Sequence, residues 1–387
     1  MTSATTQAHV AELDALRGIA IFAVLMTHVV NSLGMMDNNL PLINLDITQF
    51  LNTGGLGVQL FFLLSGFLLT TTETRRYAGG AGSLGGYACR RFLRLAPTYY
   101  LALALALLFA LWNHDYHPAL NPGLDLTIYF TFLHGLALGT HSNLDPVYWS
   151  LTCEVVFYAA LPFVLRFAGP LRVRLLWYAA TLVLAAGVYL WYASESNVEL
   201  RFYLIFHPFA HLHLFLAGSI LAVLAERRAR GVGRPLPAVS GDFLLLLALA
   251  GITLNAYVNH LPPVGQMVSR LGTETLVAVG FAAYMLGSPL LKAILALPGL
   301  AALGRISYSI YLFHGLLIGL AAKAGSVRLL HQWAAAGVPH LALFTLYMAA
   351  TLLVVVPICT LTYYWIERPG MRAFRRVRPR VRLSPAA

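Results

Sequence analysis

Residues 14–34 read DALRGIAIFAVLMTHVVNSLG, an apolar stretch that contains the ionisable side chains of Asp14, Arg17 and His28. A helix rises 1.5 Å per residue, so about 20 residues cross the ~30 Å hydrocarbon core of a bilayer. The stretch therefore predicts a transmembrane helix. Ionisable side chains are costly inside a membrane, so those in this helix indicate a buried partner or a function.

Apolar stretches of this length recur along the whole chain. Hydrophobic residues make up 59% of the 387 residues and charged residues only 11%, whereas a soluble protein carries roughly a quarter. We predict an all-α polytopic membrane protein, a single domain of about ten transmembrane helices with a basic tail at 368–387. The predicted spans lie at about 14–34, 55–72, 94–112, 149–167, 174–193, 203–225, 242–260, 271–287, 303–322 and 341–366.

The segment at about 120–145 decides the topology. Its apolar part, 124–141, contains Asp125, His134 and His141. If this part crossed the membrane, most Lys and Arg residues would lie outside, against the positive-inside rule. If it is re-entrant or interfacial, only four cations lie outside, namely Arg201, Arg270, Lys323 and Arg328. We therefore predict a non-crossing element here and both termini in the cytosol, in a cytoplasmic (inner) membrane.

The net charge of +11 could indicate an anionic partner such as nucleic acid. The basic residues lie mostly at the ends of apolar stretches, which is typical of a topology signal, so we predict no nucleic-acid partner. The cysteines Cys89, Cys153 and Cys359 show no pairing pattern that indicates disulfides or zinc. His207 and His211 are four residues apart and could ligate a metal ion. Interfacial histidines are more usual, and we predict no metal.

Two candidate groups lie in the first and third predicted spans. Arg17 and His28 are eleven residues apart, so they share nearly one helix face about 16 Å apart along the axis. Arg17 is near the cytosolic end and His28 lies in the outward half; a neutral histidine with one hydrogen bond also explains His28. Arg91 and Arg94 share a face at the cytosolic surface. Paired guanidinium groups suit phosphate, although anchoring at the membrane surface explains them equally well.

Further polar residues occur in the second, fourth and ninth spans. Ser65-Gly66 allows a backbone or a ligand to approach closely, and a packing seam of small residues is an equal alternative. Trp149 fits an outer aromatic belt, with Ser150 beside it. Glu154 is not explained by anchoring and is a candidate acid, base or histidine-orienting group. The ninth span adds four residues along one side, Ser307, Tyr308, Tyr311 and His314. At the end of the last span, Glu367 indicates a helix stop at the interface.

In order along the chain, these motifs resemble integral-membrane acyltransferase family three, whose members acylate surface glycans, lipid-linked sugars and some secreted metabolites. Each motif alone is weak, but six in order are specific. One departure is Cys153, where a second acidic or small residue is usual. The motifs are Leu13-Asp14-Ala15-Leu16-Arg17 with His28, Phe61-Phe62-x-x-Ser65-Gly66-Phe67, Arg91-x-x-Arg94 with Pro97, Trp149-Ser150-Leu151-x-x-Glu154-x-x-Phe157-Tyr158, Ser307-Tyr308-x-x-Tyr311-Leu312-x-His314, and Glu367-Arg368-Pro369.

The resemblance implies a membrane-bound O-acyltransferase that modifies polysaccharides or other sugar-containing molecules. His28 would be the catalytic histidine and Glu154 would support the active site, while Arg17, Arg91 and Arg94 would help to bind acyl-CoA from the cytosol. The supporting residues would be Asp14, Ser65, Trp149, Ser150, Tyr308 and His314. The donor would be acyl-CoA, with acetyl-CoA expected, and no cofactor would be bound. The acceptor would be a hydroxyl of a carbohydrate or a glycosylated small molecule, and membrane lipid would surround the protein.

The main alternative is a polytopic transporter or flippase for a glycan or lipid-linked substrate. A proton relay would use the same kinds of buried residue. Against it, the sequence shows no inverted repeat, and a cytosolic arginine pair suits a phosphorylated donor better. Acyl transfer is therefore the favoured interpretation. The sequence leaves open the acceptor, the length of the acyl chain, a covalent acyl-enzyme and the oligomeric state.

Overall fold

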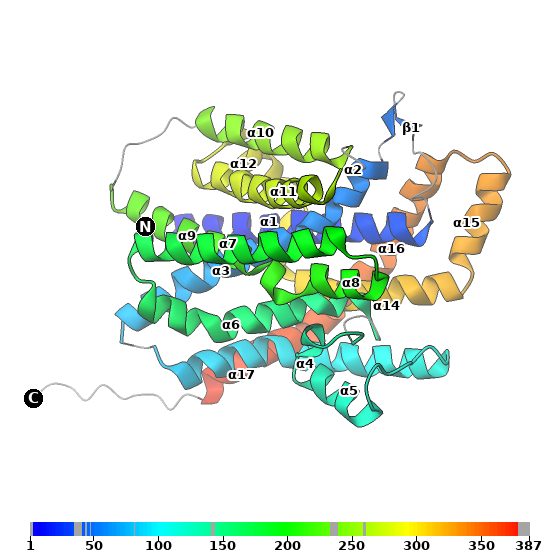
Figure 1. The fold of residues 1–387 in the computed structure, drawn as a ribbon, viewed down its shortest axis with the longest axis horizontal. Helices are drawn as coiled ribbons and strands as arrows, with labels where there is room; N and C mark the ends of the chain where they lie inside the picture. Colours follow the sequence, from blue (N-terminus) through cyan, green and yellow to red (C-terminus); the bar gives the residue numbers. More distant parts are fainter. Residues whose placement is uncertain are drawn as a thin grey trace, which may run out of the picture.

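A computed structural model describes residues 3–34, 41–42, 45–46, 48–80, 82–140, 144–232, 239–257 and 261–377. His141 and the end of the basic tail, residues 378–387, lie outside these ranges. The first part of the tail forms a helix, α17, that packs against α4 near the start of that helix (Figure 1).

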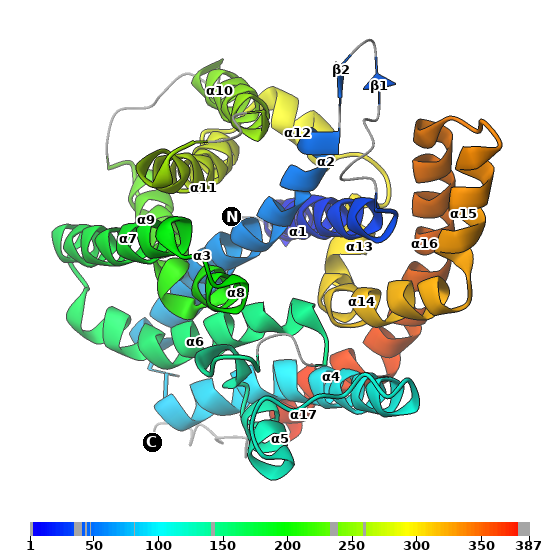
Figure 2. The ribbon, with the colours of Figure 1, turned by 45° about the vertical axis from the view of Figure 1, so that its right-hand side comes forward.

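The fold is all-helical, as the sequence predicts; most of its long helices run side by side, and α16 slants across this direction (Figures 1 and 2). The long helices are α1 (Ser3–Ser32), α3 (Leu56–Ala78), α4 (Leu84–Trp112), α6 (Trp149–Phe167), α7 (Leu171–Ser194), α9 (Leu212–Ala229), α10 (Val239–Ala256), α11 (Pro263–Met285), α14 (Ser307–Lys323) and α16 (His340–Thr362). The only strands in the described ranges are β1 (Pro41–Leu42) and β2 (Leu45–Asp46), a short antiparallel pair.

Short helices connect the long ones. They are α2 (Thr48–Asn52), η2 (Thr53–Gly55), α5 (Pro122–Phe130), η3 (His134–Leu136), η4 (Pro146–Tyr148), α8 (Val198–Phe206), η5 (Pro208–Ala210), α12 (Pro289–Leu295), α13 (Leu300–Arg305), α15 (Ser326–Ala335), η6 (Tyr363–Glu367) and α17 (Arg368–Val377).

Among the described residues, six helical segments are long and apolar enough to cross a membrane, and eight if each of two bent pairs is one span. The bent pairs are α11 with α12, at 93°, and α14 with α15, at 61°. Helix α9 carries Glu226, Arg227 and Arg228 near its end, and α10 is short, so neither passes the same test. These two helices would complete the predicted ten, and that number remains a prediction.

Glycine allows the central helices to pack backbone against backbone. A Cβ atom on Gly66 of α3 would lie 2.0 Å from the Phe215 carbonyl oxygen of α9, and one on Gly218 would lie 2.1 Å from the Leu63 oxygen. No side chain fits at these distances, so α3 and α9 cross as closely as two backbones can. The packing-seam interpretation is thus correct for Gly66, and this crossing fixes the position of Ser65 beside it.

The segment at 120–145 does not contain a membrane-spanning helix in its described part. Helix α5 has nine residues, about 14 Å, which is half of the hydrocarbon thickness. Tyr99 and Tyr100 of α4 hold it, since their hydroxyl groups donate to the carbonyl oxygens of Tyr129 and Phe130 at 2.8 and 2.9 Å. The segment therefore agrees with the expected interfacial or re-entrant element.

Two predicted helix boundaries were wrong. The stretch at 203–225 is broken at 207–211, because Pro208 lacks an N–H group and forces an extended conformation on His207 (φ −70°, ψ 139°). The helix stop at Glu367 does not occur, because α16 continues through the π-helical turn η6 into α17. Glu367 is buried, and its carboxylate accepts a hydrogen bond from Ser309 at 2.7 Å.

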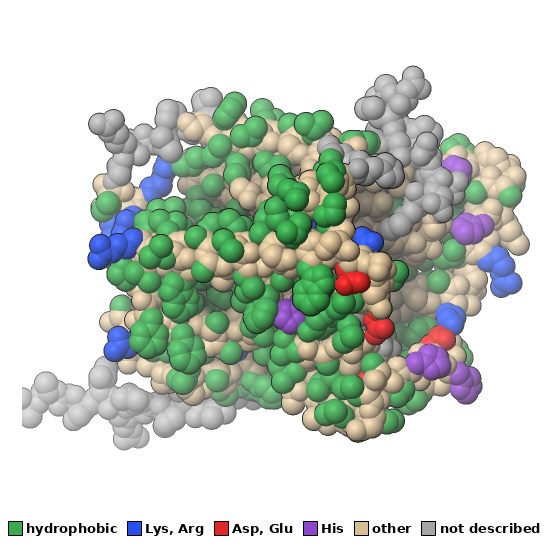
Figure 3. Space-filling view, in the orientation of Figure 1, with side chains coloured by type: hydrophobic (Ala, Val, Ile, Leu, Met, Phe, Trp, Pro, Cys, Tyr) green, Lys and Arg blue, Asp and Glu red, His purple; other side chains and the backbone are tan. Residues whose placement is uncertain are grey.

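One end of the bundle is rich in arginine. Arg75, Arg76, Arg166, Arg227 and Arg228 lie in the last turns of α3, α6 and α9, and we call this the basic end. In Figure 3 Lys and Arg side chains lie at the left edge and also on the right, hydrophobic side chains cover the middle, and the acidic side chains and most of the histidines lie towards the right. An apolar band between polar ends is the surface expected of an integral membrane protein. The cytosolic location of the basic end stays a prediction.

Candidate active site

A pocket lies inside the bundle between α1, α3, α4, α6 and α14. It brings together predicted site residues that are far apart in the sequence. The lining residues are Arg17, Val58, Phe61, Phe62, Ser65, Arg94, Leu95, Ser150, Leu151, Glu154, Ser307, Tyr308 and Tyr311.

Two guanidinium groups line this pocket. Arg17 forms one long ion pair, with Nη1 3.9 Å from the Asp14 carboxylate. Arg94 contacts the Met371 sulfur at 3.9 Å, and within the described ranges it has no carboxylate within 4.0 Å. Each guanidinium offers five N–H donors, so the pair can still bind an anionic group with several oxygen atoms.

Glu154 lines the same pocket and is held by two hydroxyl groups. The Ser65 Oγ donates to its Oε1 at 3.2 Å, and the Tyr158 hydroxyl donates to the same atom. In the part of the chain that the structure describes, no hydrogen bond or ion pair joins Glu154 to His28. The acid is therefore placed near the two pocket arginines, and its predicted role in catalysis is not tested by this geometry.

His28 lies further along α1, beyond the lining of the pocket. Its ring is 4.7 Å from that of His314, with an angle of 70° between the planes. The His314 ring in turn lies 5.8 Å from that of Tyr311, which lines the pocket. The Tyr311 hydroxyl accepts a hydrogen bond from Ser150 and donates to the Val147 carbonyl, both at 2.7 Å. His28 is thus connected to the pocket through α14.

Arg91 does not join Arg94 in the pocket. Its guanidinium lies 3.8 Å from the buried carboxylate of Glu73 and over the rings of Tyr87 and Tyr158. Glu73 also binds Arg90 at 2.8 Å. The spacing of three residues predicts that Arg91 and Arg94 share a helix face. It does not show that the Glu73 carboxylate of α3 holds Arg91. The two arginines that line the pocket together are instead Arg17 and Arg94.

Three supporting residues have structural contacts of their own. Trp149 is buried and stacks on Phe206, with ring centres 4.8 Å apart, so its assignment to an outer aromatic belt was wrong. Tyr308 lines the pocket and donates its hydroxyl hydrogen to the Leu95 carbonyl at 2.9 Å. Ser150 also lines the pocket, and its hydroxyl donates to the Tyr311 hydroxyl at 2.7 Å.

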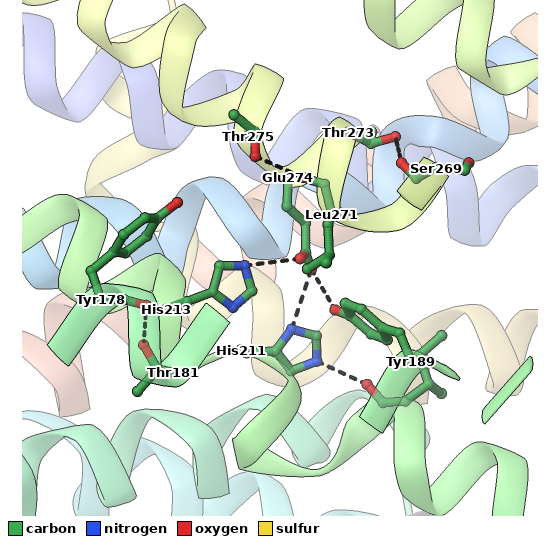
Figure 4. A network of polar contacts seen from close by, with 11 residues as sticks. Tyr178, Thr181, Tyr189, His211, His213, Ser269, Leu271, Thr273, Glu274 and Thr275 are labelled. Atoms are coloured by element: carbon green, nitrogen blue, oxygen red, sulfur yellow. Dashed lines mark hydrogen bonds and ion pairs between the residues drawn. The ribbon is translucent and has the colours of Figure 1, made fainter. Parts of the chain in front are cut away.

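Sequence reasoning missed a buried acid on α11. In Figure 4, His211, His213 and Tyr189 converge on Glu274. The distances to its carboxylate are 3.5 Å from His211, 3.0 Å from His213 and 2.6 Å from the Tyr189 hydroxyl. His211 therefore pairs with this acid rather than with His207. Over the described ranges, no three His, Cys, Asp or Glu side chains have the geometry of a metal site. The signal in the sequence that could have identified this site is Glu274 itself, a carboxylate within an apolar helix.

Comparison with known proteins gives one consistent result. A family model described as an acyltransferase domain matches residues 10–364. The chain is 28% identical to Acyltransferase MdmB of Streptomyces mycarofaciens, over 95% of this chain and 93% of that protein. It is 27% identical to Exopolysaccharide production protein ExoZ of Rhizobium meliloti (strain 1021), over 83% and 91% respectively. It is 24% identical to Peptidoglycan O-acetyltransferase OatA of Listeria monocytogenes, over 95% and 57%. No solved structure matches the chain.

The family match covers nearly all of the chain, including all the helices that line the pocket and the residues that connect it to His28. The apolar helices are long enough for a membrane location. The chain therefore belongs to this acyltransferase family and is an integral-membrane acyltransferase.

Proposed function

We propose that this acyltransferase moves an acyl group, with acetyl as the expected group, from acyl-CoA to a hydroxyl of a sugar-containing acceptor. The observation that carries the proposal is the pocket in which Arg17 and Arg94 lie together, three helical turns from His28 on α1. A sugar acceptor is supported by two relatives, which are named for exopolysaccharide production and for peptidoglycan O-acetylation.

The donor half of the reaction follows from charge. Acyl-CoA carries phosphate groups at one end and the thioester at the other, joined by an extended arm. Two guanidinium groups form charge-assisted hydrogen bonds to phosphate, which are stronger than neutral ones. The distance of about 16 Å from Arg17 to His28 along the helix suits the length of that arm. Phosphates bound at Arg17 and Arg94 would therefore place the thioester near His28.

The acceptor half uses His28 as a general base. Its lone pair takes the proton of the acceptor hydroxyl while the hydroxyl oxygen attacks the thioester carbonyl carbon. The carbon–sulfur bond then breaks, the acyl group stays on the acceptor oxygen as an ester, and the leaving thiolate takes the proton from the imidazolium. The donor and the acceptor supply every atom and electron of the products, and His28 is returned to its starting state.

The test is the release of CoA thiol and the transfer of labelled acyl group by purified protein in lipid nanodiscs, with a panel of glycan acceptors. The His28→Ala variant should lose at least ~100-fold in kcat, the usual contribution of a general base. His331→Ala is a matched control, because His331 binds the Leu33 carbonyl outside the pocket. Full activity in His28→Ala would contradict the assignment. If the wild type binds acyl-CoA and moves a glycan without releasing thiol, the protein is a transporter.

A further inference from the structure

The base in the proposed mechanism needs a neighbour that fixes its orientation. A general base works only when its lone pair points at the proton, and in a histidine the hydrogen bond made by one ring nitrogen decides which nitrogen is free. Glu154 is bonded to Ser65 and Tyr158 in the pocket. The ring that contacts His28 in the described structure is that of His314, at 4.7 Å.

The hydrogen bonds of His314 determine its tautomer. Its Nδ1 lies 3.1 Å from the Ile310 carbonyl oxygen and 2.8 Å from that of Tyr311. Carbonyl oxygens only accept hydrogen bonds, so Nδ1 carries the hydrogen and donates. In a neutral ring, Nε2 then holds a lone pair. This assignment rests on the partners of the ring, as it does for any histidine whose hydrogens are placed by inference.

The Nε2 atom of His314 is buried and has no partner. The side chain is 0% exposed, and no atom of the described ranges hydrogen-bonds to Nε2. Buried acceptors are almost always satisfied in proteins, so one that is not calls for an explanation. The adjacent His28 ring carries the N–H group that Nε2 lacks, because a neutral imidazole has one donor and one acceptor.

The separation of the two rings allows the bond. Each ring nitrogen lies about 1.2 Å from its ring centre, so centres 4.7 Å apart can bring one nitrogen of each ring to a hydrogen-bond distance of about 2.9 Å. In the structure the planes are at 70° and no bond is formed between them. A hydrogen bond to Nε2 would need the His28 ring to turn about its last side-chain torsion until its N–H group faces that atom.

We propose that His314 is the positioning residue for His28. Its Nε2 accepts the N–H of His28, which leaves the lone pair on the other His28 nitrogen as the base. When His28 takes the acceptor proton, the same bond holds the imidazolium in place. This inference rests on the proposed role of His28, and it assigns the orienting function to α14 rather than to Glu154.

Helix α14 is well placed to hold His314 still. Tyr311, one turn earlier, is anchored through its hydroxyl to Ser150 and to the Val147 carbonyl. The next residue, Gly315, lies so close to Asp145 that a Cβ atom would be 2.6 Å from both carboxylate oxygens. The contacts of Tyr311 and Gly315, on either side of His314, therefore hold α14 against residues 145–150, which lead into α6.

The kinetic test compares His314→Phe, His314→Gln and the control His331→Phe in nanodiscs. Phe keeps the ring shape without a nitrogen, and the Gln side-chain oxygen can accept a hydrogen bond near the position of Nε2. We expect kcat to fall about 100-fold in the Phe variant and about 10-fold in the Gln variant. The KM for acyl-CoA should stay within about two-fold in both, because Arg17 and Arg94 are untouched. The control should match the wild type.

A spectroscopic test separates positioning from mere packing. Protein labelled with ¹⁵N in the histidine rings would be examined by NMR, with the His28 signals identified by their loss in His28→Ala. The wild type should show a single His28 tautomer with a hydrogen-bonded N–H, and His314→Phe should show a mixture without that bond. Unchanged His28 signals in folded His314→Phe, or a kcat within two-fold of the wild type, would overturn the proposal.

The two proposals fail in different ways. If the wild type transfers no acyl group to any acceptor, the proposed function is wrong. A change of the His28 tautomer in His314→Phe would still support the pairing of the two rings. If transfer occurs and needs His28 but not His314, the function stands and the positioning role is wrong.

Discussion

The first group of arginines, Arg90 and Arg91 of α4, has surroundings opposite to those of the second, Arg94 of α4 with Arg17 of α1. Arg90 and Arg91 surround the fully buried carboxylate of Glu73, with the closest contact at 2.8 Å. Arg94, three residues on, lines the pocket with Arg17 and meets no carboxylate within 4.0 Å among the described residues. Breaking a buried pair of guanidinium and carboxylate is strongly destabilising, whereas a guanidinium that lines a pocket without such a close partner is available for a ligand.

The largest expected effect is on the stability of the protein when the site around Arg90 and Arg91 is disrupted. Glu73→Ala would leave several guanidinium groups beside an empty buried site, which costs about 3–5 kcal/mol. Thermal unfolding in detergent would measure it. The control is Glu226→Ala, which removes an exposed ion pair to Arg230 and should change the stability by less than ~0.5 kcal/mol. Equal stabilities in the two variants would remove the distinction between the groups.

The next effect is on donor binding by the second group. Arg94→Ala should raise the KM for acyl-CoA about 10- to 150-fold, which corresponds to the loss of a hydrogen bond to a charged group of about 1.5–3 kcal/mol. Stability should change by less than ~1 kcal/mol, because Arg94 forms no ion pair within 4.0 Å among the described residues. Arg166→Ala, on the exposed basic end, is the matched control. A KM that is unchanged in Arg94→Ala would mean that the pocket does not bind the donor phosphates.

The smallest expected effect is that of removing the charge of Glu154, which contrasts this acid in the pocket with the buried Glu73. In Glu154→Gln the amide oxygen can still accept the bonds from Ser65 and Tyr158, so stability should change by less than ~1 kcal/mol. Because a negative charge leaves the neighbourhood of Arg17 and Arg94, acyl-CoA should bind a few-fold more tightly. Equilibrium binding of acyl-CoA would show it. Weaker binding in this variant would mean that Glu154 organises the arginines instead of opposing the donor.

Much of the pocket could be predicted from motif positions, but not the partners of its residues. Arg17, Ser65, Arg94, Ser150, Glu154 and Tyr308 all line one pocket. Arg91 and Trp149 were expected at the cytosolic surface and in an outer belt. Their positions depend on Glu73 of α3 and on Phe206 of α8, which are distant in sequence. Periodicity reports the face of one helix and not the residue that faces it on another.

The buried acids show the same limit. Glu274 and Glu367 gave no motif-level signal of their actual partners, His211 with His213 in one case and Ser309 in the other. A carboxylate in an apolar helix indicates that a partner exists. Which residue it is depends on helix packing, since the partners lie at the start of α9 and on α14.

The sequence by itself determined the membrane location and the all-helical class, because the length of an apolar stretch measured against the bilayer thickness is a local property. It also determined which residue types are present in order along the spans. Only the tertiary structure decided that Arg17 rather than Arg91 shares the pocket with Arg94, and that His314 is the ring beside His28. Those contacts join different helices. They depend on how the helices pack, including the close approaches at Gly66 and Gly218, and the sequence of a single helix does not determine that packing.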